Sequence, residues 1–561
     1  MAKVLILGLD GATFDLIIPW VQSGKLPHFA RLLSRGVSGR LHSTIPPMSP
    51  PAWNSFMTGT NPGKHGIYDF TGRKPHSYET QFINASWRRA PTLWQHLSQA
   101  GKRVAVLSVP FTYPPERVNG IMVSGMDAPG VAGLVDRSAT YPPEFYDELR
   151  AEVGEYPMGP NLFAYNDPCD SLEDALRTME RKAAAAFHLY QREAWDFFML
   201  VLGETDGTSH RFWRFCDPLS PLRDEKPPDP KVANALLSIY HKADEVVGQF
   251  LQLASQNTSL MVISDHGNGG NGDRAVYMNR WLENQGWLTF KRFEGLMKDG
   301  LEMTKHLGLK FLSPRVKRMV YRLTNLPNVV ESWARFSAID WKQTQVYCEE
   351  TPYFPSLWIN LKGREPLGIV EPCAYEKMRD RIMAQLTSWR NPYTGQIMIK
   401  RVYRREELYS GPYVQNAPDV IIEWELDSGY SYLFRPSAGK RKPPVDTVNR
   451  EERPRLKSGD HRAEGIFCAM GRHFATPMAI EGAKIIDLAP TILYLLGLPI
   501  PSAMDGKVLT GIFSDDFLTS HVIRYCDGSG AAVDLNAFHP DFSSEEEAAI
   551  RSRLEGLGYI A

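Results

Sequence analysis

The sequence has almost no net charge, and its few cysteines are far apart. Its 561 residues include 63 lysines and arginines against 64 aspartates and glutamates, for a formal charge of −1. Such a balance gives no general attraction to nucleic acid or to an anionic membrane surface. The six cysteines form no Cys-X-X-Cys or other short metal-binding spacing, which indicates free thiols in a reducing compartment.

Long apolar segments and internal repeats are also missing from the sequence. The longest clearly apolar run, residues 197–202, has the length of a strand and is too short to cross a bilayer. The apolar run at residues 3–9 is too short for a signal peptide and is followed at once by Asp10. We therefore expect a cytoplasmic protein without a membrane span, and the length allows roughly two to four domains.

Apolar runs alternate with amphipathic stretches in the first half of the chain. Buried strands are predicted at residues 3–9, 103–109, 121–124, 195–202 and 258–264. Helices are predicted from Ser171 onward and over residues 231–255. This alternation is typical of an α/β fold with a mostly parallel central sheet covered by helices.

The alternation breaks between about Gly286 and Arg435. We interpret residues 286–435 as an inserted cap subdomain between two parts of a catalytic core, residues 1–285 and residues 436–561, the second of which ends in a helix. A basic, apolar segment at 305–323 is interpreted as a cap helix with a solvated face. Contact with a membrane or with an anionic substrate is the alternative. The sequence does not predict the oligomeric state.

Seven residues in five short segments predict the chemistry. Parallel strands would bring several of them to one sheet edge, because three of the segments directly follow strand-like runs. Carboxylate, imidazole and hydroxyl ligands suit hard or borderline divalent metals. Seven is about the number that two neighbouring metals need if each keeps an open position, and such a pair supports phosphoryl transfer. The seven are Asp10, Ser49, Asp206, His210, Asp265, His266 and His461.

The local sequence around these residues allows simpler interpretations. Ser49 before two prolines is typical of a helix N-cap, and the same position would favour a bound anion. Asp206 and His210 share a face if they are helical, although a capping aspartate and a surface histidine would look the same. Gly267 is expected to allow a turn after the Asp265–His266 pair.

Six segments together resemble the type I phosphodiesterase/nucleotide pyrophosphatase branch of the alkaline phosphatase superfamily. The resemblance runs in order from residue 3 to about residue 510, and it implies a three-layer sandwich with two divalent metals. Zinc suits the Asp/His mixture best, and manganese is the alternative. The segments are LGLDG, SPPAWNSFMTGTNPGKHGIYDF, ETDGTSH, VISDHGN, GDHRAEGI and IIDLAPTILYLLGLP.

The resemblance also implies a role for each ligand. One metal would be held by Asp206, His210 and His461. The other would be held by Asp10, Asp265 and His266, with Ser49 beside it or bound to it. Ser49 would be the nucleophile and would carry the phosphoryl group as an intermediate.

Two positions depart from the family pattern. The nucleophile of the pyrophosphatases is usually threonine, whereas this chain has Ser49, which leaves the chemistry unchanged. Their phosphate-binding asparagine after His-Gly-Ile is Phe70 here, which puts nucleotide pyrophosphatase specificity in doubt. His65 in the same segment is interpreted as structural. Four other residues are considered as substitute donors without a preference among them: Asn54, Lys64, Arg73 and Lys74.

The expected activity is hydrolysis of a small-molecule phosphate ester, most similar to that of a phosphodiesterase or nucleotide pyrophosphatase. A phosphomonoesterase or a phosphomutase of the same superfamily is the alternative. A sulfatase is disfavoured because the segment after Ser49 lacks the required arginine. A non-catalytic metal- or ligand-binding protein that kept the fold is the alternative from another class. No nucleic acid polymer is expected as a partner.

Overall fold

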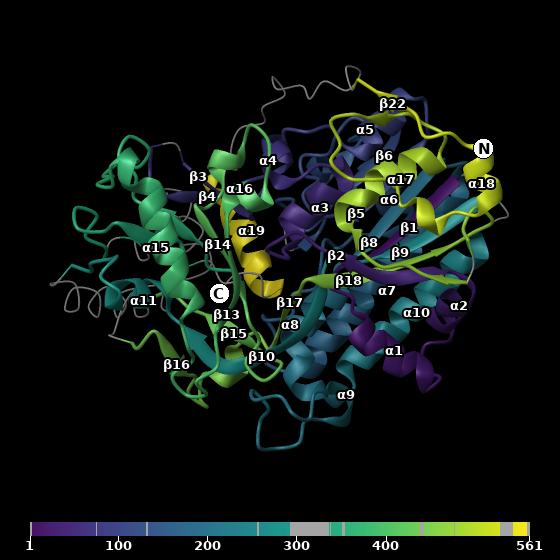
Figure 1. Cartoon of the computed structure of the whole chain (residues 1–561). Helices are drawn as coiled ribbons and strands as arrows, with labels where there is room; N and C mark the ends of the chain where they lie inside the picture. Colours follow the sequence, from purple (N-terminus) through teal and green to yellow (C-terminus); the bar gives the residue numbers. More distant parts are fainter. Residues whose placement is uncertain are drawn as a thin grey trace.

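The computed structural model describes residues 3–74, 76–130, 133–254, 257–291, 336, 338–350, 354–437, 442–475, 477–527 and 542–557. A larger lobe with the central sheet and a smaller lobe lie side by side (Figure 1). The basic segment 305–323 lies outside the described residues. Within the described part of the chain, no helix is both long and apolar enough to cross a membrane.

The larger lobe is built on one ten-stranded mixed sheet. Its central strands β9, β1, β8, β5 and β6 run parallel, whereas β18 is antiparallel to both β9 and β2, and β7 is antiparallel to β6. This confirms the predicted α/β fold with a mostly parallel sheet. The strand order is β19 (Met478–Ala479), β2 (Val37–His42), β18 (Glu464–Met470), β9 (Thr258–Ile263), β1 (Lys3–Leu9), β8 (Phe197–Leu202), β5 (Val104–Val109), β6 (Gly120–Ser124) and β7 (Thr140–Tyr141), with β20 (Ala483–Lys484) beside β2.

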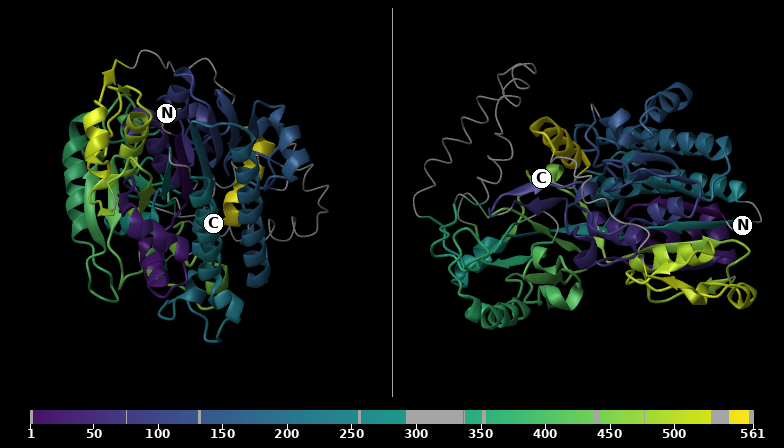
Figure 2. Two further views of the ribbon diagram at one scale, coloured as in Figure 1. Left: turned by 90° about the vertical axis from the view of Figure 1, so that its right-hand side faces the viewer. Right: turned by 90° about the horizontal axis from the view of Figure 1, so that it is seen from above.

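Helices cover both faces of this sheet and make three layers (Figure 2). Side chains alternate across a strand, so Leu5 and Leu7 of β1 face one layer while Val4 and Ile6 face the other. The first layer contains α1 (Phe14–Gln22), α2 (Pro27–Arg35), α7 (Pro168–Arg192), α8 (Glu204–Cys216) and α10 (Ala235–Leu253). The second contains α3 (Ser49–Thr58), α5 (Leu93–Gln99) and α17 (Leu488–Leu495).

Two predicted helices differ from those in the structure. Helix α7 begins at Pro168, because the Asp167 side chain caps it, and the Ser171 hydroxyl instead donates to the Leu162 carbonyl. The helix predicted over residues 231–255 is interrupted at Asn234, which separates α9 (Pro230–Ala233) from α10.

The smaller lobe has an apolar core of its own. Its antiparallel sheet has the order β11 (Val346–Cys348), β12 (Leu357–Ile359), β14 (Val420–Trp424) and β13 (Ile399–Arg404), with α11 (Met278–Asn284) and α15 (Tyr375–Thr387) beside it. Its core also takes in Val276 and Val445, which lie outside 286–435. The cap boundaries themselves stay a prediction.

Strand β10 (Gly267–Val276) connects the region of the predicted metal ligands with the smaller lobe. It begins directly after His266 and pairs first with β17 (Gly459–Arg462), then with β15 (Ser431–Phe434) and β16 (Val445–Thr447). The remaining elements are short or peripheral: α4 (Pro62–His65), α6 (Phe145–Val153), α16 (Arg405–Leu408), α18 (Asp515–Ser520), α19 (Ser544–Leu557), β3 (Thr71–Arg73), β4 (Thr80–Phe82), β21 (Ile500–Pro501) and β22 (Tyr525–Cys526).

Candidate metal centre

Three neighbouring parallel strands deliver acidic and histidine side chains to one edge of the sheet. Asp10 follows β1 directly, and the Asp265–His266 pair follows β9. Asp206 lies in the first turn of α8, just after β8. The strand ends are level, since Gly8 pairs with Ile263 and Leu9 with Leu202. The order of the parallel strands therefore brings together ligands that are up to 256 residues apart.

Asp206, His210 and His461 form one side of the centre. The His210 Nε2 atom lies 3.1 Å from Asp206 Oδ2 and 3.3 Å from His461 Nε2. The His461 Nε2 atom lies 3.6 Å from Asp206 Oδ1. Asp206 and His210 lie on one face of α8, as the four-residue spacing predicted, while β17 supplies His461. We call this group the Asp206 side.

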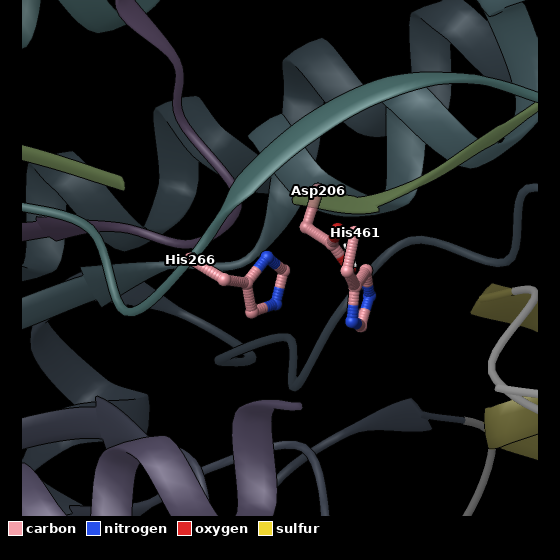
Figure 3. A group of neighbouring side chains, drawn as sticks. All are labelled: Asp206, His266 and His461. Carbon is pink, nitrogen blue, oxygen red and sulfur yellow. Dashed lines mark ion pairs between the residues drawn. The ribbon is translucent and has the colours of Figure 1, made fainter. Parts of the chain in front are cut away.

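Asp10, Asp265, His266 and Ser49 form the other side, which we call the Asp10 side. The His266 Nε2 atom lies 3.5 Å from Asp10 Oδ1, 3.4 Å from Asp265 Oδ2 and 3.1 Å from Ser49 Oγ. His266 also stacks on His461 with 3.8 Å between ring centroids, and these two rings lie together beside Asp206 (Figure 3). The candidate ligand atom of His266 lies within 4.8 Å of those of Asp206 and His461. It also lies within 4.8 Å of those of Asp10 and Asp265, so His266 lies between the two sides.

The three site histidines share one tautomer. The Nδ1 atom of His210 lies 2.9 Å from the Gly459 carbonyl, and that of His266 lies 3.0 Å from the Gly267 carbonyl. His461 makes the same contact with the Pro47 carbonyl at 2.9 Å. A carbonyl only accepts, so each Nδ1 carries the proton and each Nε2 presents a lone pair to the site. Such backbone bonds are how proteins orient histidines that bind metals.

The spacing of these acceptor atoms fits bound cations. Lone pairs and carboxylate oxygens face each other at 3.1–3.6 Å, which is repulsive unless a cation or a proton lies between them. Two ligands of a tetrahedral zinc ion with bonds of about 2.1 Å lie roughly 3.4 Å apart. In the part of the chain that the structure describes, Asp10 Oδ1 and Asp265 Oδ2 are buried without a hydrogen-bond partner. These residues therefore fit a divalent metal.

The buried carboxylates differ in charge state when no metal is present. Burial, the Asp265 charge and the Asp206 charge raise the pKa of Asp10 well above its usual value. Burial and the Asp206 charge raise the pKa of Asp265 to about 8. Burial also opposes ionisation of Asp206, yet His210 and His461 together lower its pKa well below the usual value. A divalent cation would allow all three carboxylates to be ionised together.

Ser49 is the first residue of α3 and does not cap it. The N-cap is Met48, and the Ser49 hydroxyl points instead to His266. The expected anion site at this helix end is also weak: Pro50 and Pro51 have no N–H, and the Ala52 N–H is bonded to the Met48 carbonyl. A phosphate would therefore need side chains or metals for its binding.

Gly267 is needed for a reason other than the expected turn. It has no positive φ, and it is the first residue of β10. A Cβ atom at Gly267 would come within 2.2 Å of the Glu464 carbonyl oxygen. The requirement is therefore close packing of β10 against the neighbouring backbone.

His65 does not join the metal ligands. Its Nδ1 accepts the Ile67 N–H at 3.1 Å, so its Nε2–H donates to the Ser55 hydroxyl, also at 3.1 Å. Burial, followed by the Arg88 charge, lowers its pKa to about 3. Both ring nitrogens are used, which agrees with the structural interpretation.

The four substitute donors considered for the missing asparagine all bond to other groups. Phe70 itself lies in an apolar cluster with Met48, the residue before Ser49. The amide of Asn54 donates to the Pro50 carbonyl and accepts from Arg88. The three basic residues form ion pairs: Lys64 with Asp505, Arg73 with Glu365, and Lys74 with Glu79.

The sequence analysis did not identify two residues that support the candidate ligands. The Trp53 Nε1–H donates to Asp10 Oδ2 at 2.9 Å, and the Asn268 amide donates to Asp206 Oδ1 at 2.9 Å. Trp53 is four residues after Ser49 on α3, and Asn268 is two residues after His266 on β10. These helical and strand spacings place them on the same faces as the predicted ligands, which is the signal that identifies them.

The chain belongs to the type I phosphodiesterase/nucleotide pyrophosphatase family, whose model matches residues 4–454. This confirms the resemblance and assigns the chain to a family of enzymes that hydrolyse phosphoric esters. Among curated proteins, none matches the sequence significantly.

Solved structures resemble this chain at low sequence identity. Phosphonoacetate hydrolase from Sinorhizobium meliloti 1021, in complex with phosphonoformate, has a TM-score of 0.50 and 14% identity. The match covers 88% of this chain and 95% of that one. Murine ectonucleotide pyrophosphatase/phosphodiesterase 5 has a TM-score of 0.46 and 13% identity, over 91% of this chain and 100% of that one.

Proposed function

We propose that this protein is a two-metal hydrolase of small-molecule phosphate esters that acts through a phospho-Ser49 intermediate. The observation that carries the proposal is the Ser49 hydroxyl, 3.1 Å from the His266 Nε2 lone pair within a buried cluster of three carboxylates and three imidazoles. A serine hydroxyl is a weak nucleophile and needs such an environment to act. The family assignment supports the same reaction class.

The chain's own residues would orient the reacting groups. The Ser49 hydroxyl gives up its proton and its oxygen attacks phosphorus, while the bond from phosphorus to the leaving oxygen breaks and that oxygen gains a proton. Water then attacks the phosphoserine, which restores Ser49 and releases the phosphorylated product. Two divalent cations, held as the resemblance implies, would lower the pKa of the hydroxyl and neutralise charge on the transferring group. Trp53 holds Asp10 in place, and the carbonyl bonds hold the imidazoles.

The family assignment supports a diester as substrate over a monoester. Met48 and Phe70 are buried in one apolar cluster, where a pyrophosphatase would have an asparagine at the second position. We propose zinc as the metal, with manganese as the alternative. The cytoplasmic location stays a prediction.

Metal analysis together with a substrate panel tests this function. The purified protein should contain about two divalent ions per chain, and it should hydrolyse bis(4-nitrophenyl) phosphate faster than 4-nitrophenyl phosphate. Faster hydrolysis of the monoester would favour the phosphomonoesterase alternative. No bound metal and no turnover would favour a non-catalytic binding protein.

A further inference from the structure

Asn268 lies where the ligand-bearing segments of the two sides meet. It is on β10, two residues after His266, and it is 1% exposed. In the pairing of β10 with β17 its register partner is His461. Along the chain its neighbour is therefore His266 of the Asp10 side, and across the strands its neighbour is His461 of the Asp206 side.

The Asn268 side chain bonds to both sides of the centre. Its Nδ2 group donates to Asp206 Oδ1 at 2.9 Å and to the Gly11 carbonyl at 3.0 Å. Gly11 directly follows Asp10, and its N–H contacts Asp265 Oδ1 at 3.4 Å. Both neighbours of the Nδ2 group are acceptors, which fixes the orientation of the amide. A continuous chain of hydrogen bonds thus joins Asp265 to Asp206 through Gly11 and Asn268.

The turn at Gly11 leaves no space for a side chain between the Asp10 turn and the Asp206 carboxylate. Its φ is +65°, which disfavours other residues. A Cβ atom at this position would lie 2.2 Å from Asn268 Nδ2 and 2.7 Å from Asp206 Oδ1. The backbone that follows Asp10 therefore packs directly against the ligand of the other side, and the Asn268 amide bonds to both at this contact.

We propose that Asn268 is a positioning residue that fixes the separation of the two metal subsites. It holds the Asp206 carboxylate in one rotamer against the Asp10 turn, so that the two groups of ligand atoms keep their spacing. The inference rests on the proposed function, because the subsites are those of that reaction. Supporting residues of this kind typically change metal affinity 10- to 100-fold when they are removed.

Asn271 supplies a matched control for this role. It is on the same strand, is fully buried, and uses the same amide group. Its Nδ2 group donates to two backbone carbonyls, those of Lys457 at 3.1 Å and Gly459 at 3.4 Å. Removal of this amide costs the same number of buried hydrogen bonds without freeing a carboxylate ligand, and the Gly459 carbonyl keeps its shorter contact with His210 Nδ1 at 2.9 Å.

The test compares Asn268→Ala and Asn271→Ala with the wild type. Zinc content after dialysis and zinc affinity by competition with a chromogenic chelator are measured, together with kcat, KM and Tm. Asn268→Ala should weaken zinc binding 10- to 100-fold and lower kcat more than it changes KM. Asn271→Ala should lower Tm and keep wild-type zinc affinity. Asn268→Ser, which retains a small donor, should lie between Asn268→Ala and the wild type.

Three results would contradict the proposals. Wild-type zinc affinity and kcat in Asn268→Ala would overturn the role of Asn268 and leave the proposed function intact. Equal losses of zinc affinity in Asn268→Ala and Asn271→Ala would show a purely structural role. Failure of the wild type to bind zinc or manganese would overturn the proposed function itself, and the positioning role with it.

Discussion

The two sides of the candidate metal centre use the same kinds of side chain but compensate their buried charge differently. On the Asp206 side, one carboxylate lies between two histidines and accepts a hydrogen bond from Asn268. On the Asp10 side, two carboxylates are close to the single His266 ring, and Asp10 Oδ1 and Asp265 Oδ2 lack hydrogen-bond partners among the described residues. Without a metal, the groups of the Asp206 side compensate one another's charge, whereas the two carboxylates of the Asp10 side repel each other.

This difference indicates which side depends more on a bound cation. Without metal, the Asp206 side can share charge among its own groups, and the Asp10 side can only keep protons on its carboxylates. The proposed nucleophile, Ser49, belongs to the second side, so reactivity is expected where the protein alone is least stable. Four predictions test this comparison.

Replacement of Ser49 should have the largest effect. Ser49→Ala removes the attacking oxygen from the Asp10 side, so turnover of a diester should fall by about 10³-fold or more. The Asp206 side contains none of its contacts, and at least one metal per chain should remain by elemental analysis. Activity close to the wild-type level would exclude Ser49 as the nucleophile, and Ser55→Ala in the same helix is the control.

Removal of metal should be the next largest effect. If free metal is present at about 1,000 times its dissociation constant, chelation should lower the free energy of unfolding by about 4 kcal/mol. Urea denaturation with and without chelator measures the change. Asp206→Asn and Asp265→Asn should each make this loss on chelation smaller, because each takes away one ligand. An unchanged unfolding curve after chelation would contradict a metal centre on either side.

The pH dependence of the chelated protein should separate the two sides. Because the folded pKa of Asp265 is raised to about 8, its contribution to stability is fully present below pH 3.8 and is lost as pH rises through 8. Between pH 6 and 9 the chelated protein should therefore lose about 2 to 3 kcal/mol. Asp265→Asn should abolish this loss, whereas Asp206→Asn should reduce it by less, because burial, the larger cause of the raised pKa, remains. Equal slopes in all three proteins would refute the asymmetry.

His65 is a buried histidine outside both sides of the centre. Its effect on the pH dependence of stability should be the smallest of the four. Its pKa is lowered to about 3, so its contribution to stability is present above pH 6.5 and is lost as pH falls toward 3. At pH 5 the loss should be about 2 kcal/mol. His65→Gln should lack this slope and keep wild-type metal content. A loss of metal in this variant would place His65 in the centre after all.

Much of the fold followed from local patterns. The apolar run of β1 and the helix of α17 are determined by their own residues, since continuous burial requires apolar side chains on every face. The ligand types were also visible, because Asp10, Asp206 and Asp265 follow apolar strands. Helix ends were less predictable: Asp167 and Met48 are the N-caps at positions where Ser171 and Ser49 were expected.

The sequence by itself determined the reaction class, through the types of the seven residues and their order along the chain. Only the tertiary structure decided how those residues are supported. The common tautomer of the three histidines depends on carbonyls of residues 47, 267 and 459, and the contact between the two sides depends on Gly11 and Asn268. Apart from the contact of His266 with its neighbour Gly267, these interactions join segments far apart in the chain. Their geometry is fixed by strand order and register, which no local pattern records.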